Sequence, residues 1–242
     1  MGKLSLILAV LFCSITFSQN WTSLKTSDIN LSSAVDNDID IFTNGYGNHI
    51  IVRESSVLKY YKMDVNGDAD TPINLEESSV VSPSISGDAN NIYVVYRKSS
   101  ENYIRTKYSP DGGSSWQYLS TTALNSNPTS IECVYSNNRL HITYEISSSA
   151  KYRYYYQNAW SAEQTVSLNE SGTTPRIASW YTSSQDRVMF LYKKTSTESR
   201  WREWNASNSS WATNPQTAFT VSSGNVSEPK GLAVDGNYIY SY

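Results

Sequence analysis

The chain has 242 residues, of which 19 are basic and 22 acidic, so its formal net charge is −3. Because no run of like charge stands out, the sequence predicts no nucleic-acid partner and no anionic membrane surface as partner. Its 19 Tyr and 7 Trp residues favour strands, and no segment beyond residue 18 keeps the period of an amphipathic helix.

Residues 1–18 have the pattern of a secretory signal peptide. Lys3 precedes an apolar run, and small residues stand before a cleavage site predicted at Gln19. A lipoprotein signal is the alternative, because Cys13 follows the apolar run. We therefore expect residues 19–242 to form a secreted protein, extracellular or at the cell surface, with no membrane span once the signal is cleaved.

Cysteine usage limits how this protein is held together. Removing the leader leaves Cys133 as the single remaining cysteine, which excludes an intrachain disulfide and a cysteine-based metal cluster. The position of Cys133 inside an inner strand predicts a buried thiol. We expect a packed core without cofactor or metal, and the oligomeric state stays open.

A pattern of four short strands recurs along the chain. Prolines at positions 83, 128, 175 and 229 repeat at intervals of about 45 to 54 residues, and an earlier copy lacks the proline. First strands are expected at residues 38–44, 83–87, 128–135, 175–181 and 229–234. Second strands are expected at residues 48–55, 91–98, 139–146, 186–194 and 237–242. Third strands are expected at residues 57–68, 103–109, 151–157 and 199–205, and fourth strands at 71–75, 116–122 and 160–168.

Four antiparallel strands at this period indicate an all-β fold, a β-propeller of four-stranded blades with four copies and a partial fifth. The segment after Trp21 matches a fourth strand and is expected to complete the last blade. The partial copy favours a fragment of a ring of five to seven blades. A five-bladed ring with an incomplete last blade is the alternative.

The turn between the third and fourth strands of the second copy, "SPDGGSSW", carries a fixed set of residues: Ser109, Asp111, Gly113, Ser115 and Trp116. This turn resembles the Asp-box of the sialidase-like (BNR repeat) β-propeller family of secreted bacterial type. The resemblance implies that the aspartate and serines bond to the turn's own backbone, that the glycine takes a positive φ, and that the tryptophan packs between blades. It predicts architecture and no catalytic role.

Charged residues gather where the second strands end and the first strands begin, on one face around the channel mouth. Candidate ligand-binding residues at second-strand ends are Arg53, Arg97, Glu145 and Lys193, and those at first-strand starts are Arg176 and Lys230. A sugar or an acidic glycan would suit such a mouth, because guanidinium binds a carboxylate through two parallel bonds. The alternative is that strand ends carry charge because they meet water.

Two other features have structural interpretations. His49 and His141 take equivalent positions at the start of second strands, which indicates packing rather than catalysis. Acidic residues at positions 64, 68 and 70 have part of the spacing of a calcium loop, but Ala69 and Leu75 depart from it, so a hairpin turn is expected. Calcium binding there stays open.

The resemblance to sialidases implies an Arg-Ile-Pro motif, an arginine triad, an aspartate acid/base and a Tyr/Glu nucleophile pair. The nearest string here, at Arg176, lacks the proline, so no catalytic residue is assigned. Because the chain departs from the catalytic pattern of that family, we expect a non-catalytic module that binds carbohydrate or a cell-surface protein. The alternatives are an exo-glycosidase of sialidase type whose tyrosine blade is missing from this chain, and a structural domain of a larger surface protein.

Overall fold

The computed structural model describes residues 35–64, 68–124, 126–181, 185–222, 232–234 and 239–241. The predicted signal peptide, the segment after Trp21 and Lys230 all lie outside these described residues. Every named element in the described part is a β-strand. No described segment forms a helix with the length and apolar character needed to cross a membrane.

The first two sheets each contain four antiparallel strands in chain order. Blade I consists of β1 (Val35–Asn44), β2 (Gly47–Glu54), β3 (Val57–Met63) and β4 (Ile73–Glu76). Blade II consists of β5 (Val80–Gly87), β6 (Ile92–Lys98), β7 (Tyr103–Ser109) and β8 (Gln117–Ala123). The strands predicted for these copies agree with the observed strands to within a few residues at most ends.

The next two sheets repeat the order, with a fourth strand that is divided in two. Blade III consists of β9 (Thr129–Ser136), β10 (Arg139–Ile146), β11 (Ser149–Tyr156), β12 (Ala159–Trp160) and β13 (Gln164–Thr165). Blade IV consists of β14 (Thr173–Tyr181), β15 (Asp186–Lys193), β16 (Glu198–Asn205), β17 (Ser210–Trp211) and β18 (Gln216–Thr220). A further two-stranded sheet pairs β19 (Leu232–Val234) with β20 (Ile239–Ser241).

The fourth strands of blades III and IV break at the same place for the same reason. In blade III the Tyr154 amide donates to Ser161 Oγ at 3.0 Å, and in blade IV the Glu203 amide donates to Thr213 Oγ1 at 3.1 Å. A side-chain hydroxyl thus takes the place of a backbone carbonyl in the ladder, which lets the strand bend away and then pair again. The sequence pattern predicted one continuous strand in blade III.

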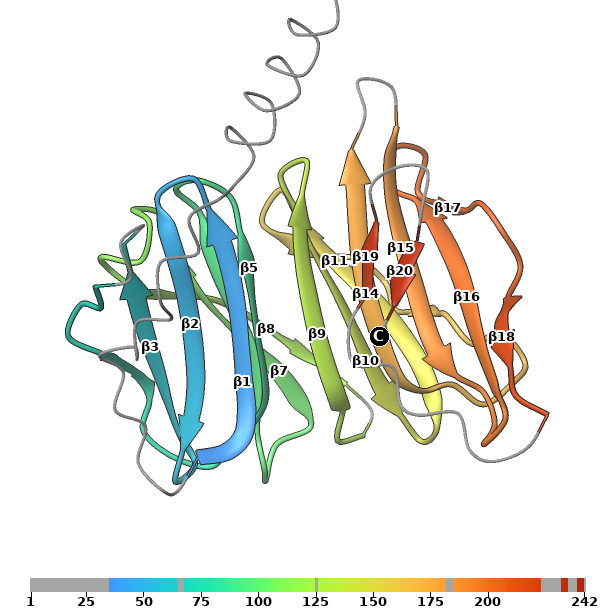
Figure 1. Cartoon of the computed structure of the whole chain (residues 1–242), viewed down its shortest axis with the longest axis horizontal. Coiled ribbons are helices and arrows are strands. Elements are labelled where there is room, and N and C mark those ends of the chain that lie inside the picture. The colour runs from blue at the N-terminus through green and yellow to red at the C-terminus, as the bar shows by residue number, and fades with distance from the viewer. Residues whose placement is uncertain are drawn as a thin grey trace, which may run out of the picture.

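The blades stand around a common axis as a β-propeller. The first strands β1, β9 and β14 run in the same direction in Figure 1, and β1 packs on β5, β5 on β9, and β9 on β14. Each hydrophobic cluster joins residues of two consecutive blades: Ile51 with Tyr96, Ile104 with Ile142, and Tyr152 with Phe190. The core therefore lies between the sheets, where each sheet buries its face against the next.

The turn at residues 109–116 has the hydrogen bonds that its sequence predicted. Asp111 Oδ1 accepts from the Ser115 amide at 2.8 Å, and Ser109 Oγ accepts from the Gly113 amide at 2.8 Å. Trp116 then packs edge-on against Tyr60 of blade I, with ring centroids 4.9 Å apart. The turn thereby fastens blade II to blade I.

Three other residues also lie as expected. Cys133 is buried and free. His49 and His141 are buried, and the Nδ1 of each lies 2.7 Å from a tyrosine hydroxyl, of Tyr60 and Tyr152 respectively. Both histidines are thus packing residues that span the second and third strands of their blades.

Gly113 provides a test of the contact between blades I and II. Its φ is +93°, and a Cβ there would overlap the hydroxyl of Tyr60. We expect Gly113→Ala to lower the free energy of unfolding by about 2 to 4 kcal/mol, measured by urea denaturation. Gly45→Ala is the control, because a Cβ there meets nothing within 4 Å. Equal stability of the two variants would contradict this packing.

Candidate functional site

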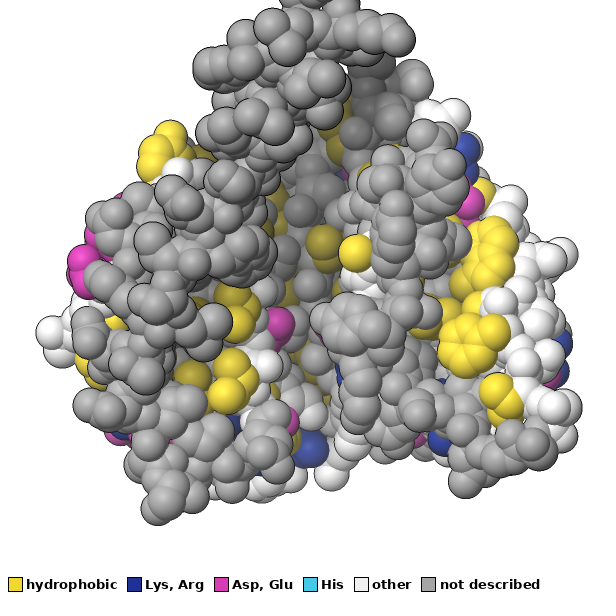
Figure 2. All heavy atoms as spheres, in the orientation of Figure 1, with side chains coloured by type: hydrophobic (Ala, Val, Ile, Leu, Met, Phe, Trp, Pro, Cys, Tyr) yellow, Lys and Arg dark blue, Asp and Glu magenta, His cyan; other side chains and the backbone are white. Residues whose placement is uncertain are grey.

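A central cavity of about 440 Å³ opens where the first strands begin. Its lining comes from residues 38–40 of β1, 82–84 of β5, 129–132 of β9, and Thr174 and Arg176 of β14. Figure 2 shows a hollow between the two halves of the molecule, with acidic side chains visible inside it. The predicted channel mouth is therefore a cavity built by four consecutive blades.

One polar residue stands at the same register position in every first strand of blades I to IV. This position pairs with Ile51, Val95, Thr143 and Leu191 of the second strands. The four residues are Asp40, Ser84, Glu132 and Arg176, and we call them the polar ring. All four line the central cavity.

In blades I and II the polar ring ties each first strand to the next. Asp40 Oδ2 accepts from the Ile85 amide at 2.9 Å and from Ser84 Oγ at 2.8 Å. Ser84 Oγ in turn accepts from the Cys133 amide at 3.1 Å. Burial raises the pKa of Asp40, and these hydrogen bonds oppose that rise because they favour the charged form.

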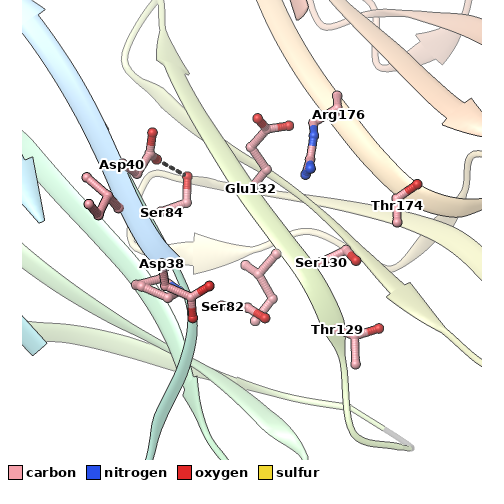
Figure 3. Close-up of a pocket in the computed structure, with 12 residues that line it drawn as sticks. Asp38, Asp40, Ser82, Ser84, Thr129, Ser130, Glu132, Thr174 and Arg176 are labelled. Atoms are coloured by element: carbon pink, nitrogen blue, oxygen red, sulfur yellow. Dashed lines mark hydrogen bonds between the residues drawn. The ribbon is translucent and has the colours of Figure 1, made fainter. Parts of the chain in front are cut away.

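In blade III the same role falls to Glu132. Its Oε2 accepts from the Ile177 amide at 2.7 Å. Figure 3 shows the side chains of Glu132 and Arg176 pointing toward each other across the space between β9 and β14. Burial raises the pKa of Glu132 to about 7, although the positive charge of Arg176 acts in the opposite direction. The cavity thus holds a carboxyl group that titrates near neutral pH.

The first strands of blades II to IV each carry a β-bulge beside the cavity. Ser82, Ser130 and Thr174 have φ values of 49°, 49° and 46°, and the register with the second strand shifts beside each of them. A bulge bends its strand and increases the local twist. Residues other than glycine rarely adopt a positive φ, and such backbone strain is common at binding sites.

Two of the predicted second-strand residues reach the neighbouring blade. Arg53 Nη1 donates to the Val80 carbonyl at 3.1 Å, and its Nε lies 2.9 Å from Asp38 Oδ2 at the cavity wall. Glu145 Oε2 accepts from the Thr174 amide at 3.0 Å. Both side chains therefore fix the start of the following first strand.

The other predicted residues differ in their surroundings. Arg97 is buried, and its Nη1 donates to the carbonyls of Lys98 and Ser99 at 3.1 and 2.9 Å, so it holds its own turn together. Lys193 pairs in register with Thr173 at the end of β15 and does not line the cavity. Lys230 lies outside the described residues. Of the five candidates that the structure describes, Arg176 is the one that lines the central cavity.

Glu132 was missed because it does not directly follow a proline. Counting one residue on from Pro83, Pro128 and Pro175 gives Ser84, Thr129 and Arg176, but Pro128 stands three residues earlier relative to the register than the other two prolines do. Counting back from the paired second strand would have found Glu132, because the register is set by pairing. Among the described residues, no group of three or more His, Cys, Asp or Glu side chains is placed to hold a metal ion.

The similarity of this chain to known proteins shows its fold alone. No protein-family model matches this sequence, and no curated protein matches it. The SapL1 lectin in complex with α-methyl fucoside is a similar solved structure, with a TM-score of 0.60 and 12% identity over 84% of this chain and 70% of SapL1. A mutant of the Aleuria aurantia lectin in complex with α-methyl-L-fucoside gives 0.54 and 16% over 81% of this chain and 65% of the lectin.

A neuraminidase-like protein is among the similar structures too. A subtype N11 neuraminidase-like protein (flat-faced bat, Peru) has a TM-score of 0.53 and 11% identity over 74% of this chain and 52% of that protein. The chain thus spans about half to 70% of the length of these three proteins. They confirm the β-propeller, which hosts both lectins and neuraminidase-like proteins.

The pKa of Glu132 predicts how stability depends on pH. Because its pKa rises from 4.5 to about 7 on folding, its contribution to stability is full below pH 4.5 and is lost as the pH rises through 7. Glu132→Gln cannot ionise but keeps an acceptor for the Ile177 amide. We expect the variant to gain about 1 to 3 kcal/mol over the wild type between pH 4.5 and 8, measured by urea denaturation.

The difference in stability between the wild type and Glu132→Gln reports the contribution of Glu132 alone. His49 and His141, whose pKa values burial lowers to about 4 and about 3, give the opposite slope below pH 6.5, and they do so in both proteins. Parallel stability curves for the wild type and Glu132→Gln would contradict the raised pKa.

Proposed function

We propose that this protein is a secreted, non-catalytic carbohydrate-binding propeller whose ligand enters the central cavity. The observation that supports this most is the polar ring: Asp40, Glu132 and Arg176 place fixed acceptors and a donor in one cavity of about 440 Å³. A sugar hydroxyl both donates and accepts, so it can bind carboxylates and a guanidinium together.

The charges of the cavity favour a neutral sugar over an acidic one. Glu132 and Asp40 both lie within the electrostatic range of Arg176, and Asp38 is paired with Arg53. A ligand carboxylate would therefore have to compete with Asp40 and Glu132 for Arg176, whereas a neutral sugar would not. Serine and threonine hydroxyls at 82, 129, 130 and 174 add further hydrogen-bonding groups.

The similar structures support the same proposal, because two of them are lectins in complex with fucosides. Secretion is proposed from residues 1–18. Among the predicted residues, direct ligand contact is proposed for Arg176. Arg53 and Glu145 shape the cavity wall through Asp38 and Thr174. A glycan on a cell surface is the partner that we propose.

Glycan-array binding followed by calorimetry tests this proposal. We expect the wild type to bind neutral glycans, with methyl α-L-fucoside among the first probes, and Arg176→Met to lower the affinity at least tenfold. Thr129→Trp should also abolish binding, because Thr129 lines the cavity and indole would fill it. Each effect follows from losing a donor or the space that a sugar ring needs.

Arg187→Met is the matched control, since Arg187 belongs to the same blade and pairs with Glu203 away from the cavity. It should bind like the wild type. Unchanged binding in both Arg176→Met and Thr129→Trp, or no binding to any neutral glycan by the wild type, would reject the central cavity as the site.

Glycoside hydrolysis is a second candidate, favoured by one observation. A carboxyl group with a pKa near 7 in a cavity is suited to act as a general acid, and Asp40 provides a second carboxyl group in the same cavity. Most glycosidases use two carboxyl groups. This hypothesis differs from sialidase chemistry, which the absent Arg-Ile-Pro motif already disfavours.

Hydrolysis and binding are separated by Glu132→Gln. If the protein is a glycosidase, the wild type should release nitrophenol from at least one neutral nitrophenyl glycoside, and the variant should lose this activity by about 100-fold or more while it still binds the sugar. Absence of turnover in the wild type across a panel of such glycosides leaves the binding function as the proposal and removes the enzymatic one.

A further inference from the structure

A second cavity lies at the opposite ends of the strands, between blades I and II. It has a volume of about 210 Å³. Blade I lines it with Tyr46 of the β1–β2 turn, His49 of β2 and Lys62 of β3, and blade II with Asn90, Asp111 and Gly112. None of these residues belongs to the central cavity, so the two sites are independent.

Among the described residues, none neutralises the positive charge that Lys62 brings to this cavity. Its ammonium group makes no hydrogen bond or ion pair with any described residue, although its charge helps to lower the pKa of His49. His49 itself is buried and engaged, with ring nitrogens 2.7 Å from Tyr60 Oη and 3.0 Å from Asn44 Nδ2. Both ring nitrogens of His49 are therefore engaged, and the ammonium group of Lys62 is the donor that a ligand in this cavity could use.

Asp111 faces the same cavity as a rigid acceptor. Oδ1 accepts from Ser109 Oγ and from the Ser115 amide, and Oδ2 accepts from Ser115 Oγ at 2.6 Å. Each carboxylate oxygen can accept two hydrogen bonds, so Oδ2 retains one position. The hydrogen bonds from Ser115 lower the pKa of Asp111 to about 2, which keeps it charged. The turn that fastens the blades also holds this carboxylate in place.

Space and an aromatic surface complete the cavity. A Cβ on Gly112 would meet only the Ala89 carbonyl oxygen at 3.8 Å and Lys62 Nζ at 3.9 Å, so the glycine leaves open volume. The Tyr46 side chain is 68% exposed beside it. The cavity has the volume of about seven water molecules in the liquid, which is too small for a drug-sized ligand.

In blades II and III, the position equivalent to Lys62 holds a tyrosine, which can fill the space between neighbouring blades. Lys62 pairs with His49 in the register where Tyr108 pairs with Tyr93 and Tyr154 pairs with His141. At the boundary of blades III and IV, the Tyr154 hydroxyl reaches Ser209 Oγ at 3.3 Å. A tyrosine thus bridges that boundary, whereas lysine leaves the boundary of blades I and II open.

We propose that the cavity between blades I and II binds one neutral monosaccharide unit, with Lys62 donating to one hydroxyl, Asp111 accepting from a neighbouring hydroxyl, and Tyr46 covering the C–H face of the ring. Opposite charges on two sides of a small cavity suit a ligand whose adjacent groups both donate and accept. A simple anion would meet the carboxylate, and an apolar ligand would leave both charges unpaired.

Backbone amide NMR on the full chain tests this site directly. The probes are the methyl glycosides of glucose, galactose, mannose and fucose, with sodium sulfate as the anionic probe. We expect at least one glycoside to shift the amide resonance of Gly112, which donates to the Asn90 carbonyl at 2.7 Å. Sulfate should shift it less at the same concentration.

Two variants close the cavity by different means. Lys62→Tyr installs the residue that blades II and III already carry, and Gly112→Asn fills the open volume with a side chain that tolerates the φ of +65°. Each should weaken glycoside binding at Gly112 at least tenfold while the urea midpoint stays close to that of the wild type. Lys107→Met is the control, because Lys107 lies over Tyr118 and outside both cavities.

Arg176→Met separates this proposal from the central cavity. It should leave the Gly112 shift unchanged even if binding in the central cavity is lost. The proposal is overturned by glycoside binding that persists in both closing variants, by a sulfate response larger than that of every glycoside, or by the absence of any shift at Gly112 in the folded wild type.

Discussion

The structure depends on how the first strands satisfy backbone amides that face the neighbouring blade. Buried amides without partners are costly, and a first strand has a second strand on only one side. Asp40, Ser84 and Glu132 solve this by accepting amides of the following first strand, at 2.9, 3.1 and 2.7 Å. The same side chains line the central cavity. Polar groups needed for assembly are therefore the groups that a ligand would meet.

Blade IV departs from this arrangement, because its polar-ring residue is an arginine. A guanidinium donates hydrogen bonds and cannot accept one from a backbone amide, so Arg176 cannot repeat the role of Glu132. Its charge instead lowers the pKa of Glu132 and Asp40 against the effect of burial. The chemistry of the cavity thus changes at one position of the repeat while the fold continues.

The repeat, the strand order and the 109–116 turn could be predicted from the sequence because each depends on local signals: alternation, turn residues and spacing. The cavity could not be predicted to the same extent. Pro83 and Pro175 directly follow the bulge residues of their strands, whereas Pro128 stands two residues before the bulge residue Ser130. Counting from Pro128 therefore gives Thr129 where pairing gives Glu132. Similarly, Arg97 binds carbonyl groups of its own turn instead of facing the cavity, and the spacing of residues in the sequence does not predict that side-chain conformation.

The divided outer strands of blades III and IV have a consequence for solubility. A long exposed strand edge invites pairing with other molecules, and proteins avoid this by keeping their edges short. Here the hydroxyls of Ser161 and Thr213 interrupt the outer ladder, which leaves β12, β13 and β17 with two residues each. At β12, β13 and β17 a foreign strand would find segments of only two residues with which to pair, so the interruptions oppose aggregation through these parts of the rim.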